Sequence, residues 1–231
     1  MERSRPVRIK YICLLALAAC IIIGALIFRT VDKSRGAEFS NAEAYIFGSY
    51  EQDGDDGDGP EPIEWIVLKE EGSRITLISK YGLDTTPYTS TGYMNGPWWT
   101  YTLTWSESYM HYWLNDYFYS TAFSAEEQSA MCDFNTAETA DMVSLLSSAE
   151  AKAYFPCDSA RICFPTEYAL SKGARVNELN GGGWWWLRCD SSRYTQASMV
   201  YSQGSVYYTG GLIYYEDCLV RPVIIIDTSL I

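Results

Sequence analysis

The side chains best suited to covalent or metal chemistry are seven cysteines and a single histidine, His111. Cys13 and Cys20 lie in a long apolar run, and the remaining cysteines are Cys132, Cys157, Cys163, Cys189 and Cys218. No two have the Cys-x-x-Cys spacing, so a structural zinc ion would find almost no ligands. The odd number leaves at least one thiol free or in an intermolecular bond. We expect one or two disulfides and small buried thiols, with no redox function and no cofactor.

Catalysis by the histidine would need a nucleophile beside it. A serine–histidine–carboxylate hydrolase would use His111 as its base, but this residue lies in a predicted amphipathic helix with no nucleophile motif nearby. We therefore expect that the protein is not an enzyme.

The densest group of carboxylates lies in residues 51–61, EQDGDDGDGPE. Its spacing superficially resembles a calcium loop, but the ordered Asp-x-Asp-x-Asp-Gly pattern and the closing glutamate are missing. A solvated hairpin loop is favoured over a metal site, and no metal is expected.

Residues 189–219 are rich in tyrosine and serine and contain neither lysine nor asparagine. Tyrosine offers a large contact area with few torsions to freeze, and serine offers adaptable hydrogen bonds, so the composition is typical of a generalist binding surface. The alternatives are an inert tyrosine-rich surface or partial core packing. We expect a ligand to contact Asp190, Ser192, Tyr194, Tyr201, Ser202, Tyr207, Tyr208, Tyr214, Tyr215 and Asp217.

Strands are expected near both ends of the domain that must position these side chains. Residues 44–50, 62–68 and 74–79 are short β-branched or aromatic runs with partial alternation, and residues 220–227 end the domain in a strongly apolar strand. Residues 141–146 indicate a further short strand or a buried loop.

Helices are expected between these strands. Thr104 with Glu107, Ser124 with Glu127 and Ser147 with Glu150 have the spacing of capping boxes. Thr166 is expected to cap another helix that Gly173 ends. The first helix places a stripe of apolar residues at helical spacing, namely Trp105, Tyr109, Trp113, Leu114, Tyr117 and Phe118.

The N-terminal residues predict a membrane anchor. Residues 1–10 are basic, and residues 11–28 are uncharged and mostly apolar, nearly enough to span a bilayer as one helix. The positive charges before the run favour a cytoplasmic N-terminus. A cleaved signal peptide, or a lipoprotein signal with its lipid on Cys20, remains open.

Charge excludes one class of partner. The chain has a net charge of −12, and residues 36–231 contain 10 basic and 27 acidic side chains, a net of −17. Such a body repels phosphate backbones, so no nucleic-acid partner is expected.

Eight short blocks follow one another along nearly all of residues 44–226. They are IFGSY (46–50), EPIEWIVL (61–68), ISKYGLD (78–84), YWLNDYFYSTAF (112–123), LLSSAEAKAYF (145–155), FPTEYA (164–169), WWLR (185–188) and VRP (220–222). The set resembles the consensus of an uncharacterised family of bacterial exported proteins with the C-type lectin fold. FPTEYA, preceded by Arg161, is similar to a block of formylglycine-generating-enzyme-like (sulfatase-modifying-factor) domains. These domains, and the variable proteins of diversity-generating retroelements, share that fold.

The resemblance implies that residues 189–219, just before VRP, form a variable binding region diversified by adenine-directed mutagenesis. Two positions depart from the relatives: Cys189-Asp190-Ser191 replaces Ser-Pro-Gly, and His111 replaces an arginine, which implies a lost internal ion pair. A formylglycine-generating enzyme would need Cys189 and Cys218 as its cysteine pair with copper, but neither lies in a matching motif. A disulfide between them at the base of the variable loops is expected instead.

These observations combine into one expected architecture. Residues 1–10 form a cytoplasmic tail, 11–28 a transmembrane signal anchor, 29–42 a tether, and 43–231 an α+β domain with a C-type-lectin-like fold. Terminal antiparallel strands would enclose helices, followed by a long C-terminal loop or hairpin region. The protein would be a single-pass cell-membrane protein whose extracellular domain binds an unknown protein or surface ligand through its Tyr/Ser-rich face. A formylglycine-generating-enzyme-like oxidase and a structural surface module are the alternatives.

Overall fold

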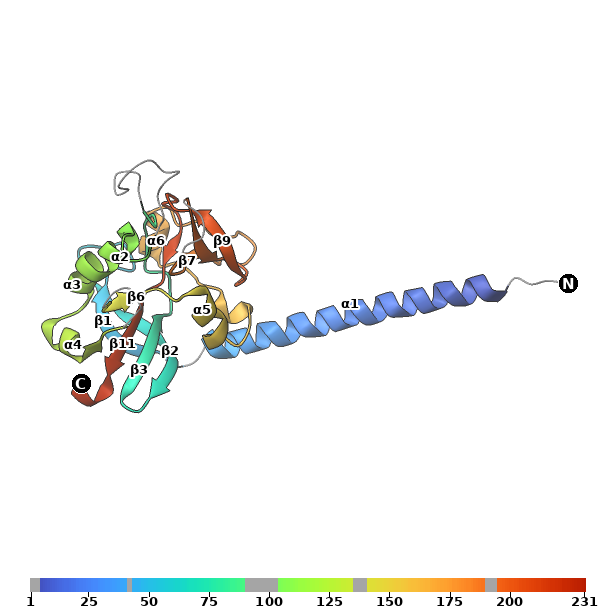
Figure 1. Ribbon diagram of the computed structural model, residues 1–231, viewed down its shortest axis with the longest axis horizontal. Helices are drawn as coiled ribbons and strands as arrows, with labels where there is room; N and C mark the ends of the chain where they lie inside the picture. Colours follow the sequence, from blue (N-terminus) through green and yellow to red (C-terminus); the bar gives the residue numbers. More distant parts are fainter. Residues whose placement is uncertain (1–4, 41–42, 90–103, 135–140, 190–194) are drawn as a thin grey trace.

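Two sheets with short helices around them make up the domain, and one long helix extends from it (Figure 1). This computed structural model describes residues 5–40, 43–89, 104–134, 141–189 and 195–231. The three strands predicted between residues 44 and 79 are confirmed, because strands form at 45–50, 61–71 and 74–79.

The larger sheet is antiparallel throughout and has its last strand in sequence near its middle. Its order is β1-β2-β3-β11-β5, and β6 also pairs with β11. The strands are β1 (Tyr45–Tyr50), β2 (Glu61–Glu71), β3 (Arg74–Ser79), β5 (Met131–Cys132), β6 (Val143–Ser144) and β11 (Val223–Asp227). Ile224 and Ile226 of β11 are fully buried, and this burial favours a strand with partners on both sides.

The second sheet is built mostly from the C-terminal third of the chain. Its order is β4-β10-β7-β8-β9, with β10 and β7 parallel and the other pairs antiparallel. The strands are β4 (Asp84–Thr85), β7 (Trp185–Trp186), β8 (Gln196–Val200), β9 (Val206–Leu212) and β10 (Leu219–Val220). Strands β4 and β9 are therefore the two edges of this sheet.

Most of the predicted helix starts are confirmed. Ser124 and Ser147 form complete capping boxes with Glu127 and Glu150, and the side chain of Thr166 accepts a hydrogen bond from the Ala169 amide. The helical elements of the domain are α2 (Tyr109–Tyr112), the π-helix η1 (Trp113–Phe118), α3 (Tyr119–Ala122), α4 (Ala125–Ala130), α5 (Ser148–Tyr154), the 3-10 turn η2 (Ser159–Arg161), α6 (Glu167–Ser171) and the 3-10 turn η3 (Thr228–Leu230).

The expected capping box at Thr104 is wrong. The helix begins later, at Tyr109, and its N-cap is Ser108, whose hydroxyl accepts from the His111 amide at 3.1 Å. The Thr104 hydroxyl instead donates to the carboxylate of Glu107 at 2.7 Å. The two side chains are thus bonded to each other at this point of the chain.

Three buried tryptophans connect strands of the two sheets to neighbouring segments of the chain. Trp65, Trp185 and Trp186 are fully buried. Each indole N–H donates to a backbone carbonyl, at distances of 2.6, 3.0 and 3.0 Å respectively. A buried indole that keeps its hydrogen bond adds apolar contact without the cost of an unsatisfied donor, so these residues fix the interior.

The expected transmembrane anchor is wrong. Residues 11–28 belong to a 36-residue helix, α1 (Arg5–Ser40), which continues beyond the apolar run into Arg29, Asp32, Lys33 and Arg35. Among the residues that the structure describes, no helix combines the length and the apolar character needed to cross a membrane. The location predicted from this anchor, a single-pass cell-membrane protein with an extracellular domain, is therefore also wrong.

The residues expected to form a tether are helical as far as Ser40, and they contact the domain. The Asp32 carboxylate accepts from the Ser159 amide at 3.3 Å, and the rings of Phe39 and Phe155 lie 5.0 Å apart. Figure 1 shows that only the C-terminal turns of α1 touch the domain, while the rest extends away from it.

The expected architecture, an α+β C-type-lectin-like domain behind a membrane helix, is therefore wrong as stated. Strands are not confined to the two ends, because β5, β6 and β7 alternate with helices. The region expected as a long loop or hairpin region contains an antiparallel hairpin, and its strands β8 and β9 belong to a five-stranded sheet. The reason is apolar burial: Ala197, Met199 and Val200 of β8 lie in the core, and a segment buried in this way needs backbone partners.

Candidate functional site

The structure separates the residues expected to contact a ligand. Asp190, Ser192 and Tyr194 lie outside the described residues. The others lie on β9, in the β8–β9 turn or in the loop before β10: Tyr201, Ser202, Tyr207, Tyr208, Tyr214, Tyr215 and Asp217.

Four of the tyrosines form one group, called here the tyrosine cluster: Tyr201, Tyr207, Tyr214 and Tyr215. The rings of Tyr201 and Tyr207 stack at 4.9 Å, and those of Tyr214 and Tyr215 meet edge to face at 6.2 Å. Tyr207 and Tyr214 are 44% and 50% exposed, whereas their two neighbours are half-buried against the core. Tyr201 and Tyr215 pack against the core, and each of them contacts one of the exposed rings.

An ion pair extends the tyrosine cluster. Arg175 donates through Nε to the Asp217 carboxylate at 2.8 Å, and its guanidinium lies 5.0 Å from the Tyr215 ring centre and 5.6 Å from that of Trp184. The pairing leaves the second Asp217 oxygen buried without a hydrogen bond to any described group. Asp217 therefore orients Arg175 and the tyrosines beside it.

Tyr208 and Ser202 do not belong to the tyrosine cluster. Tyr208, which follows Tyr207 on β9, is 57% exposed and contacts Lys152 of α5, with the ammonium 4.5 Å from its ring centre. Ser202 is fully buried, and its hydroxyl accepts from the Asn177 side chain at 3.3 Å. The single Tyr/Ser face expected from the sequence is thus divided, because a strand sends successive side chains to opposite sides.

Cys189 and Cys218 are both buried in the same apolar cluster as the scaffold tryptophan Trp186. The structure shows Cys218 as a thiol, and burial, with Asp217 adding to it, raises its pKa well above the usual range. A thiol of this kind is a weak nucleophile. The disulfide between the two residues stays a prediction that a thiol count would test.

A second group of aromatic residues surrounds a cavity of about 360 Å³ at the opposite edge of the second sheet. It is called here the aromatic pocket and is lined by Asp84, Tyr109, Tyr112, Trp113, Asp116, Tyr117 and Lys172. None of them was expected to have a functional role.

A buried carboxylate forms one wall of the aromatic pocket. Asp84 is 1% exposed, accepts from the hydroxyl of Tyr50 at 2.6 Å, and lies 2.5 Å from the ammonium of Lys172. Burial, reinforced by the negative charge of Asp84, raises the pKa of Tyr50 far above its usual value. Burial opposes the charged form of Lys172, but the hydrogen bond and attraction of Asp84 outweigh it and raise the pKa of this lysine. The ion pair is therefore intact at neutral pH.

The π-helix explains why the sequence pattern did not predict this pocket. The expected apolar stripe assigned Trp113 and Tyr117 to one buried face of an ordinary helix, but Trp113 is 7% exposed and Tyr117 is 49% exposed. Hydrogen bonds of the i→i+5 type over Trp113–Phe118 widen the turn and move Tyr117 outward. No local feature of the sequence signals such a turn.

The histidine is used structurally. His111 Nε2 lies 2.8 Å from one carboxylate oxygen of Asp141, and the Trp105 indole N–H donates to the other oxygen. Asp141 thus has an imidazole and an indole as side-chain partners, and the loss of an internal ion pair that the resemblance implies stays a prediction.

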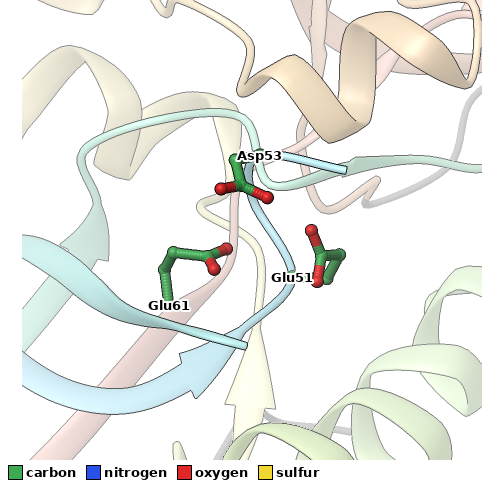
Figure 2. Close-up of side chains that lie close together, drawn as sticks. All are labelled: Glu51, Asp53 and Glu61. Carbon is green, nitrogen blue, oxygen red and sulfur yellow. The ribbon is translucent and has the colours of Figure 1, made fainter. Parts of the chain in front are cut away.

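One acidic group could hold a metal ion among the described residues. Figure 2 shows Glu51, Asp53 and Glu61 at the hairpin between β1 and β2, and one oxygen from each lies within 4.8 Å of the others. Two of the carboxylates already accept backbone amides, Glu51 from Gly54 and Glu61 from Gln52, each at 2.6 Å. These bonds account for the positions of the side chains. The segment is the hairpin loop that the sequence predicted, since it connects the paired strands β1 and β2.

Comparison with curated proteins and with solved structures found no match to this chain. One family model matches residues 64–228. This range includes all residues of the tyrosine cluster and the aromatic pocket, and both sheets except β1 and the first three residues of β2. The family is described as "Domain of unknown function (DUF6273)". Because the match covers more than half of the chain, this protein belongs to the DUF6273 family.

Proposed function

We propose that the protein is a binding module that recognises a protein partner through the tyrosine cluster. The observation that carries the proposal is the paired packing of these rings. Tyr207 and Tyr214 present large exposed faces, while Tyr201 and Tyr215 restrict their movement. Rings that are already ordered lose little entropy on binding, which favours affinity.

The neighbouring side chains favour a protein over a small molecule. Tyrosine, tryptophan and arginine are the residues most often found at the energetic centres of protein interfaces, and Tyr215, Trp184 and Arg175 lie in contact here. Arg175 is 43% exposed in its side chain, so it can reach a partner while Asp217 holds it.

The test compares variants of the full chain that are immobilised and exposed to proteins from the cells that produce it. The double variant Tyr207→Ser/Tyr214→Ser removes both exposed rings, and Tyr117→Ser is the matched control, since it removes an equally exposed tyrosine at the other edge of the sheet. We expect one protein to bind to the wild type and the control, and to be lost from the double variant. Binding to all three alike, or to none, would overturn the proposal.

We further propose that the exposed tyrosines vary between copies of the gene through a diversity-generating retroelement. Support comes from their position, because the exposed rings lie in residues 189–219, just before VRP. The test is genomic: a nearby reverse-transcriptase gene and a near-repeat of the coding region for 189–219, differing at adenines. If both are missing, diversification is refuted and the binding proposal stands alone.

A further inference from the structure

We propose that the aromatic pocket binds a small organic cation of the quaternary-ammonium or alkylammonium class. This site is separate from the tyrosine cluster and lies at the other edge of the second sheet. The inference depends on the charges in the pocket, on its aromatic walls and on the π-helix that places them.

The charges in the aromatic pocket favour a cation. Two carboxylates and one ammonium line it, and the ammonium of Lys172 is already paired with Asp84 at 2.5 Å. The remaining carboxylate, Asp116, is exposed and makes no hydrogen bond or ion pair with a described side chain. The pocket therefore has one uncompensated negative charge, in a chain whose net charge is −12.

The walls supply faces on which a cation can rest. Trp113 and Tyr117 lie with their ring centres 5.8 Å apart, and Tyr109 and Tyr112 lie 6.4 Å apart beside them. The electron-rich face of an aromatic ring attracts a cation. The exposed rings are those of Tyr112 and Tyr117, whereas Trp113 is buried, stacks on Phe118 at 5.6 Å and supports Tyr117 from behind. Methylated ammonium groups gain most, because their apolar methyl groups also leave water when they contact the rings.

The π-helix places three of these residues together. Trp113, Asp116 and Tyr117 all belong to η1, and π-helical turns are rare in proteins and frequent at functional sites. The side chain of Asn115 fixes the turn, since it donates to the Val143 carbonyl at 2.9 Å and accepts from the Met142 amide at 2.9 Å. The widened turn is thus anchored on its buried side while its other side faces the cavity.

An anionic ligand fits this site poorly. It would have to take Lys172 away from Asp84, which is 1% exposed and would be left buried without its counter-ion. The cavity of about 360 Å³ is near the lower end of the range for ligand pockets, roughly 300–1,000 Å³. A compact head group of the size of choline suits both the volume and the charge.

The experiment titrates the full chain with choline and with its neutral carbon analogue, in which a tert-butyl group replaces the trimethylammonium group. The two compounds have nearly the same shape, so the comparison isolates the charge. Calorimetry should show choline binding about tenfold more tightly than the neutral analogue. A parallel titration with glycerophosphocholine distinguishes a lipid head group from a free cation as the source of the ammonium group.

Three variants complete the test. Asp116→Asn and Tyr117→Leu should each weaken choline binding about tenfold, and Asp116→Asn should leave the neutral analogue unaffected. Glu126→Gln, which removes an exposed carboxylate on α4 outside the pocket, should change nothing. All three side chains are exposed, so we expect the variants to fold like the wild type. Equal binding of both compounds, no choline binding by the wild type, or an unchanged Asp116→Asn would each overturn the proposal.

Discussion

The two edges of the second sheet both carry tyrosines, but they arrange them differently. At the β9 edge, the rings of the tyrosine cluster support one another and the nearby Arg175 is neutralised by Asp217. At the β4 edge, the rings surround a cavity that contains an uncompensated carboxylate. Tyrosine content alone therefore does not indicate a ligand class. Our two proposals therefore rest on the charge beside the rings and on whether the rings form a surface or a cavity.

The largest effect on stability is expected from a change in β7, the strand in the middle of the second sheet. Trp185 lies on the central strand β7, is fully buried, and donates its indole N–H to the Arg161 carbonyl at 3.0 Å. Trp185→Ala should lower the free energy of unfolding by about 3–5 kcal/mol because it leaves a large cavity. Thermal unfolding measures this loss. If choline binding survived in a variant whose β9 edge had unfolded, the two edges would not be coupled through this strand.

A second change should disturb the β9 edge alone. Gly204 has a φ of +87° in the turn between β8 and β9, and a Cβ atom there would lie 1.6 Å from the Asp158 carbonyl oxygen. Gly204→Ala should destabilise the protein by about 2–3 kcal/mol, through strain and displacement of the turn. We expect loss of partner binding with choline affinity retained. A chemical-denaturation series on the variant and on Gly54→Ala, where the added methyl group meets no atom, separates the clash from the effect of φ.

Near the β4 edge, Tyr50 should make the stability of the protein depend on pH in alkaline solution. The pKa of Tyr50 is raised in the folded protein, so its contribution to stability is complete below pH 10, the usual value for tyrosine, and is lost as the pH rises above it. Tyr50→Phe should cost about 1.5–2 kcal/mol at pH 7, since it removes a hydrogen bond to a charged group. The variant should then lose less stability than the wild type between pH 9 and pH 12 (roughly one unit below to two above that value). Parallel curves of stability against pH would contradict this assignment.

The smallest effect is expected at Tyr208, which is on β9 but outside the tyrosine cluster. Its ring is 57% exposed, and the Lys152 ammonium lies 4.5 Å from the ring centre. Tyr208→Ala should change stability by about 0.5 kcal/mol or less and should leave partner binding intact. Loss of the partner in this variant would show that the interface extends around the edge of the sheet to α5.

Local signals in the sequence predicted the elements better than the sites. The caps at Ser124, Ser147 and Thr166 are short-range patterns, and the structure contains them. The aromatic pocket could not be predicted in the same way, because Asp84, Lys172 and the η1 residues come from three separate segments. The turn that directs Tyr117 outward depends on a hydrogen-bond pattern that leaves no mark in the sequence.

The tyrosine-rich region shows the limit of composition as evidence. Its bias drew attention to residues 189–219, where Tyr207 and Tyr214 are exposed, but it also assigned the buried Ser202 to the surface. Ser202 lies in the turn between β8 and β9, where its hydroxyl accepts from the side chain of Asn177, so its burial depends on a segment distant in the sequence. Composition does not indicate such a contact.

The position of β11 has a consequence for the order in which the molecule folds. This strand is the last in the sequence, yet it pairs with β3, β5 and β6, which are spread over the preceding part of the domain. During synthesis, β3 can pair with β2 but keeps one open edge, and the short strands β5 and β6 wait for their partner β11, until residues 223–227 leave the ribosome. Such long-range pairing slows folding and exposes strand edges to other chains. The nascent protein is therefore most vulnerable to aggregation just before this strand emerges, and it completes its larger sheet in a single late step.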